Sequence, residues 1–208
     1  DDPVRDRLRM RANNGAGDTL KDMGDLAGAK LYFEVGLAEA RRLQPKYGVA
    51  NTIPFEDLAV SYDRLGNVAL LQGDLAEAGK FFGLALDVSD EFVKLAPKNP
   101  NVLRDKATSL DWVGDVARLR GDPDGATRHY EESLQLRLQL VELDPEGSRL
   151  VRDLVVSHVK LGDRALEDGD SRDATLHFRS AMKEAERLVA ADPGNVAFQV
   201  DLTVCQNR

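Results

Sequence analysis

The sequence of 208 residues contains a single cysteine, Cys205. One cysteine excludes an internal disulfide framework and is typical of a reducing compartment, so we expect a cytoplasmic protein. No apolar run approaches the length of about 18 residues that a membrane-spanning helix needs. The sequence therefore predicts no membrane partner.

Aromatic residues are also scarce, at 6% of the chain, and cationic residues are outnumbered, which gives a net charge of −8. Binding to a nucleic-acid backbone requires a high density of Lys and Arg. We therefore expect no nucleic-acid partner. A protein or peptide partner is expected instead, and the acidic balance weakly favours a basic segment.

Motifs for catalysis are missing as well: the chain has no Gly-rich phosphate loop, nucleophile elbow or HExxH sequence. The three histidines, His129, His158 and His177, do not have the spacing of metal ligands. We interpret His129 and His177 as partly exposed helix residues. The sequence predicts no catalytic residue, no metal site, no cofactor and no enzyme activity.

What the chain does contain is an internal repeat with a period of 48 residues. Three sets of residues recur at this spacing: Gly66, Gly114 and Gly162; Gly73, Gly121 and Gly169; Phe82, Tyr130 and Phe178. A first, less regular copy places Gly17, Gly24 and Phe33 at an offset of 49. A unit of about 20 to 50 residues that recurs in register predicts a stacked array.

The repeat divides residues 1–208 into one array. Its units cover residues 1–54, 55–100, 101–147 and 148–195, with a partial fifth unit at 196–208. Because residue 1 is not Met and the chain stops inside a repeat, we expect either an excerpt of a longer protein or a partial helix that caps the array.

Each unit reads as two helices joined by a Gly-Asp pair. The glycine can adopt the left-handed conformation that ends a helix, and the aspartate can cap the next one. We predict helices over about 1–23, 25–44, 55–72, 75–96, 102–120, 123–143, 149–168 and 171–191, with a loop at 45–54. Mid-helix glycines such as Gly66 indicate close packing against the aromatic of the paired helix.

Asp and Ser also recur four residues apart, as in Asp57 and Ser61. The pair could suggest a site, but its repetition favours structural hydrogen bonding near each helix start.

The repeat carries a family signature. Leu110-x-x-Val113-Gly114-x-x-Ala117, then Ala126-x-x-x-Tyr130 and Pro145, follows the tetratricopeptide repeat (TPR) pattern, and His158 to Pro193 follows it again. The chain resembles a TPR protein over nearly its whole length, although the family's period is about 34 residues. In its long period the chain is similar to bacterial multidomain proteins. The resemblance implies an all-α fold, a right-handed α-solenoid of stacked antiparallel helix pairs.

The resemblance also implies a function, that of a non-catalytic scaffold or recognition module. In TPR proteins the first helices of the units line a concave groove that receives a partner peptide. The positions that match are Asp18, Lys21, Asp63, Arg64, Asn67, Leu70, Asp111, Trp112, Asp115, Arg118, Lys160 and Asp163. TPR domains that clamp a C-terminal carboxylate use Lys, Asn and Arg at set groove positions. This chain has Asp63, Trp112 and Val156 at several of these positions, so we do not predict binding of a chaperone C-terminal peptide.

Trp112 is the only tryptophan. It either anchors a partner in the groove or packs against an adjacent helix. Two other roles for the whole chain stay open. The array could self-associate by end-to-end stacking, or it could be the regulatory region of a larger multidomain effector or enzyme.

Overall fold

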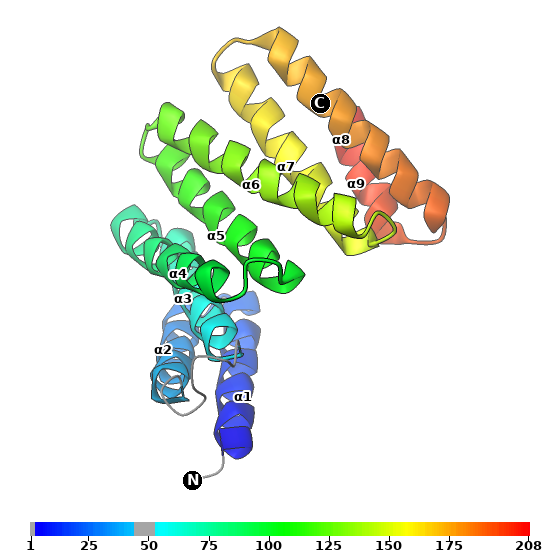
Figure 1. Cartoon of the computed structure of the whole chain (residues 1–208). Helices are drawn as coiled ribbons and strands as arrows, with labels where there is room; N and C mark the ends of the chain where they lie inside the picture. The colour runs from blue at the N-terminus through cyan, green and yellow to red at the C-terminus, as the bar shows by residue number, and fades with distance from the viewer. Residues whose placement is uncertain (1–2, 44–52) are drawn as a thin grey trace. The chain divides into compact units, whose positions relative to one another are not determined.

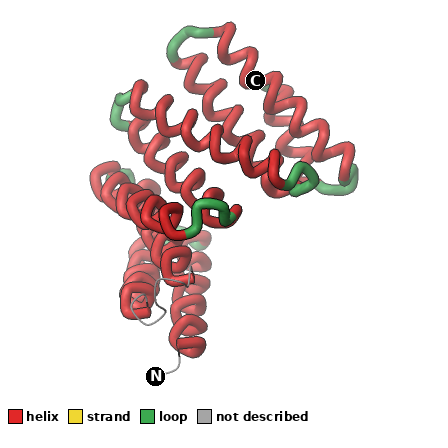
Figure 2. The backbone as a smooth tube through the Cα atoms, in the orientation of Figure 1, coloured by secondary structure: helices red, strands yellow, loops and turns green. Residues whose placement is uncertain are grey.

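The computed structural model describes residues 3–43 and 53–208, and in these ranges it contains α-helices and no strand (Figure 2). The helices are α1 Pro3–Asp22, α2 Leu26–Leu43, α3 Ile53–Leu71, α4 Leu75–Leu95, α5 Pro100–Leu119, α6 Pro123–Leu143, α7 Ser148–Glu167, α8 Ser171–Ala191 and α9 Val196–Gln206 (Figure 1). The all-α prediction is confirmed. Most of the predicted loop at 45–54 lies outside the described residues, but Ile53 and Pro54 belong to α3.

The Gly-Asp junctions have the geometry that the sequence predicts. Gly24, Gly73, Gly121 and Gly169 have φ between 77° and 85°, where only glycine is unstrained. At the second junction, the Asp74 side chain accepts a hydrogen bond from the backbone N–H of Glu77 at 2.8 Å. These sharp junctions reverse the chain, so that α1 pairs with α2, α3 with α4, and α7 with α8.

The chain separates into two compact units, Asp1–Gly121 and Asp122–Arg208. Unit 1 contains α1 to α5, and unit 2 contains α6 to α9. The boundary falls inside the predicted third repeat, and one continuous array over residues 1–208 stays a prediction. None of the helices in residues 3–43 and 53–208 combines the length and the apolar character that a membrane span requires.

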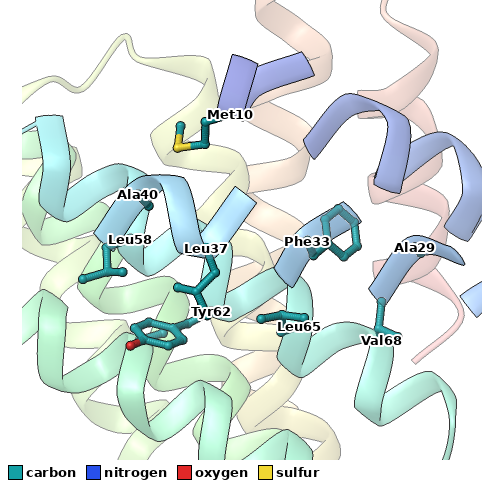
Figure 3. Close-up of a cluster of buried hydrophobic side chains, with 10 residues drawn as sticks. Met10, Ala29, Phe33, Leu37, Ala40, Leu58, Tyr62, Leu65 and Val68 are labelled. Atoms are coloured by element: carbon teal, nitrogen blue, oxygen red, sulfur yellow. The ribbon is translucent and has the colours of Figure 1, made fainter. Parts of the chain in front are cut away.

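The core of unit 1 lies between successive helix pairs. Phe33 and Leu37 of α2 pack in one buried cluster with Tyr62 and Leu65 of α3 (Figure 3). Each helix pair alone would leave this face in water, so the second pair buries what the first one exposes.

The mid-helix glycines allow two helices of a pair to approach closely. A Cβ at Gly66 would lie 2.6 Å from the ring of Phe82, and one at Gly162 would lie 2.5 Å from Phe178. Gly17 of α1 stands in the same relation to Phe33, where a Cβ would lie 2.5 Å from the ring. The predicted contact between glycine and aromatic is therefore present in both units.

We predict that Gly66→Ala lowers the free energy of unfolding by about 1–3 kcal/mol, because the added methyl overpacks the contact with Phe82. Gly83 is the matched control, since it lies inside α4 and a Cβ there meets nothing within 4 Å. Gly83→Ala should raise stability by about 0.5–1 kcal/mol. Urea denaturation measures both. Equal effects of the two substitutions would refute close approach as the reason for Gly66.

Candidate functional site

A groove in unit 1 gathers most of the predicted site residues of that unit. It consists of two adjacent openings that share Asp18, Val60 and Arg64. We call the first the Asp63 pocket: it measures about 230 Å³ and is lined by Asp18, Lys21, Phe33, Val60, Asp63, Arg64, Asn67 and Trp112. The second, the Arg7 pocket, measures about 430 Å³ and is lined by Arg7, Met10, Arg11, Asn14, Gly15, Asp18, Glu56, Asp57, Val60 and Arg64.

Two ion pairs connect α1 to α3 along this groove. Arg7 Nε lies 2.8 Å from Asp57 Oδ2 near the start of both helices. Further along, Arg64 Nη2 lies 3.0 Å from Asp18 Oδ2, and Arg64 Nε donates to the same carboxylate. Bidentate contacts of this kind fix geometry as well as charge, so they hold the groove walls in place.

Arg64 and Trp112 play one structural role in successive repeats. The Arg64 guanidinium lies 5.9 Å from the ring centroid of Phe33, and the Trp112 indole stacks on Phe82 at 5.2 Å with an interplanar angle of 5°. In unit 2, Lys160 Nζ lies 5.2 Å from the ring centroid of Tyr130. The residue two before each mid-helix glycine therefore covers the core aromatic of the preceding pair.

Asp63 has an unusual environment for a carboxylate. Its Oδ1 is covered and has no hydrogen-bond partner, although the residue as a whole is partly exposed and lines the pocket. Burial and the neighbouring carboxylate of Asp105 raise the pKa of Asp63 to about 7, while Arg64 acts in the opposite direction. Near neutral pH this group is poised between its two protonation states.

Comparison with known proteins supports the interpretation of the fold. The chain is similar to BtubC (BKLC) from P. vanneervenii, with 19% identity and a TM-score of 0.69 over 100% of this chain and 80% of that one. It is also similar to TTC0263, a thermophilic TPR protein of Thermus thermophilus, with 14% identity and a TM-score of 0.51 over 96% of this chain and 100% of that one.

The chain has a TPR-like fold. No family model and no curated protein matches its sequence.

The other predicted site residues of unit 1 do not line the Asp63 pocket. Asp111, predicted at the groove edge, is instead buried at 6% exposure. Leu70 packs against the core cluster that contains Phe82. Arg118 is exposed and Asp115 is half-buried, and neither lines the Asp63 pocket.

The predicted residues of unit 2 do not lie in the groove of unit 1. Lys160 covers Tyr130 and also lines an apolar opening beside Val156 and Val204. Asp163 forms an ion pair with Arg208 at 2.9 Å. Arg208 and Asp163 occupy the repeat positions of Arg64 and Asp18, so this ion pair is the counterpart of the one in unit 1.

Several contacts were not anticipated from the sequence. Phe33 and Val60 line the Asp63 pocket, and the Nδ1 atoms of His158 and His177 lie 3.1 Å apart. Burial, and then the charge of His177, lowers the pKa of His158 to about 4. His158 and His177 occupy the repeat positions of Tyr62 and Phe81, which also form a ring contact. Comparison of repeat positions could therefore have indicated that the two histidines are neighbours.

The serines of the Asp-x-x-x-Ser pattern are buried and structural. Ser61 Oγ donates to the backbone carbonyl of Asp57 at 2.7 Å, and Ser157 accepts from Arg137 at 2.6 Å. Within residues 3–43 and 53–208, no group of three or more His, Cys, Asp or Glu side chains could hold a metal ion.

We predict that Asp63→Asn stabilises the protein more at high pH than at low pH. The pKa of Asp63 is raised to about 7 in the folded state, so the folded state binds the proton more tightly than the unfolded state does. The resulting contribution to the free energy of unfolding is complete below about pH 4 and is lost as the pH rises through about 7. The gain from Asp63→Asn should therefore be larger at about pH 8 than at about pH 4 by on the order of 2 kcal/mol.

Urea unfolding at the two pH values measures the difference. The exposed Asp87 serves as control, and Asp87→Asn should change stability alike at both pH values. A pH-independent effect of Asp63→Asn would contradict the prediction.

Proposed function

We propose that this protein is a non-catalytic binding module that receives a peptide segment of a partner protein in the groove of unit 1. The observation that carries the proposal is the convergence of α1, α3 and α5 side chains on the Asp63 pocket, next to a second opening along α1 and α3. Concave sites lined by an aromatic residue and a few placed polar groups are typical of ligand binding.

The groove is held in shape before any partner arrives. The Arg7–Asp57 and Arg64–Asp18 ion pairs fix α1 against α3, and stacking on Phe82 fixes Trp112. A partner segment then loses less free energy to ordering of the groove, because the groove side chains are already immobilised.

The groove has contacts for both apolar and polar parts of a peptide. Val60 is 38% exposed and lines both openings, so it offers an apolar surface where they meet. Asn67 and Asp63 add polar groups that can accept hydrogen bonds. An extended peptide that lies along α1 and α3 would contact both openings.

We predict that Val60→Glu weakens peptide binding by about tenfold or more, because it places a charge where the two openings meet. Peptides are selected from a random library on the immobilised protein and then synthesised singly. Their affinities are measured by fluorescence anisotropy. Leu71→Glu is the matched control, since Leu71 is exposed on the same helix and lines neither opening.

The Leu71→Glu variant should bind within about twofold of the wild type. The groove proposal is wrong if the library yields no specific binder, or if Val60→Glu binds the selected peptides as tightly as Leu71→Glu does.

A second candidate function, self-association, is favoured by α9. Val196, Val200 and Val204 are spaced four residues apart and are 70%, 54% and 43% exposed, so they form an apolar stripe on one helix face. An exposed apolar stripe of this kind marks a surface that another protein can cover. In unit 1, Leu31 and Val35 of α2 form a second exposed apolar pair.

Head-to-tail contact between these two surfaces in different copies would build oligomers. Light scattering over a concentration series should then show a mass that rises with concentration, and Val200→Glu with Val204→Glu should abolish the rise. A constant monomer mass for the unmodified chain would exclude self-association.

A further inference from the structure

The carboxylate of Asp63 is only partly compensated by the charge of Arg64 and makes no hydrogen bond at Oδ1. Its Oδ1 is covered and accepts no hydrogen bond, while the residue lines an open pocket. Buried carboxylate oxygens in folded proteins are nearly always paired, since an unsatisfied acceptor destabilises the fold. Because Oδ1 itself is covered, a cation would approach the carboxylate from the pocket that the residue lines, and its charge would favour the ionised form.

The cations of the same pocket are engaged elsewhere. Arg64 donates to Asp18 from both Nε and Nη2 and makes no hydrogen bond to Asp63 Oδ1, although its charge favours the ionised form of Asp63. Lys21 Nζ lies 3.8 Å from Asp18 and 3.9 Å from Asp22. The positive charge inside the pocket is thus balanced by other carboxylates.

The remaining walls suit a long side chain with a charged end. Trp112 and Val60 provide apolar surface, and Asn67 provides an amide. Arg and Lys side chains combine an apolar stem with a cationic group, and their stems pack well on apolar surface. An aromatic ring beside the cation adds a further attraction.

We propose that the Asp63 pocket binds an arginine or lysine side chain of the partner peptide, whose cationic group donates to the Asp63 carboxylate while its stem packs on Trp112 and Val60. This inference rests on the proposed function, since it names the side-chain class that the groove selects. A ligand carboxylate would be repelled by the same Asp63 charge.

The uniqueness of Trp112 supplies the measurement. The NMR spectrum of the full chain has one indole N–H signal, because the sequence has no other tryptophan, and that signal comes from a residue that lines the pocket. We would titrate N-acetyl-argininamide and N-acetyl-lysinamide at fixed ionic strength. N-acetyl-citrullinamide, a neutral compound of nearly the same shape as the arginine probe, is the reference.

The two cationic probes should shift the indole signal saturably, with the citrulline probe binding about tenfold more weakly or not at all. Asp63→Asn should weaken binding of the arginine probe by about tenfold or more. Asp87→Asn, an exposed aspartate of the same unit, should leave it within about twofold. The ratio of arginine to lysine affinity shows which cation the pocket prefers.

The inference is overturned if citrullinamide binds as well as argininamide, or if Asp63→Asn binds argininamide as tightly as the wild type. The comparison of probes uses the wild-type chain, so it decides the question even if a variant fails to fold. Library peptides that depend on Val60 but tolerate Asp63→Asn would reject the cation site and leave the groove function standing.

Discussion

The packing of unit 1 depends on how its core aromatics Phe33 and Phe82 are enclosed from two sides. Phe82 meets Gly66 of its own helix pair and the Trp112 indole of the next pair. Phe33 is enclosed in the same way by Gly17 and the guanidinium of Arg64. The glycine allows close spacing inside a pair and the covering residue packs between pairs, so a single aromatic ring takes part in both contacts.

This constraint explains why predicted groove residues are not simply free for a partner. Arg64 covers Phe33 and also pairs with Asp18, so its charge is used within the fold. In unit 2 the equivalent ion pair joins Arg208 to Asp163. The positions that face a groove in a TPR array serve here as contacts between helix layers.

The sequence predicted the fold well because its signals are local and repeated. Gly73 and Asp74 determine a helix junction within a few residues, and the 48-residue spacing transfers that conclusion to Gly121 and Gly169. The site was less predictable. Equivalence by repeat position places Asp63 and Asp111 alike, yet Asp63 lines a pocket whereas Asp111 is buried. The burial of each aspartate depends on the side chains around it, and the repeat period does not determine which residues these are.

The departures from the repeat distinguish the surroundings of Asp63 from the equivalent positions in other repeats. Arg64 covers an aromatic ring and forms an ion pair with Asp18. At the equivalent positions of unit 2, Arg208 forms an ion pair with Asp163. Trp112 replaces the cation at this position, and the residue equivalent to Asp18 is Asn67, so both members of the pair become neutral together. Both line the Asp63 pocket. The layer contact beside Asp63 is therefore neutral, and this neutrality is a departure from the repeat that underlies the proposed cation site.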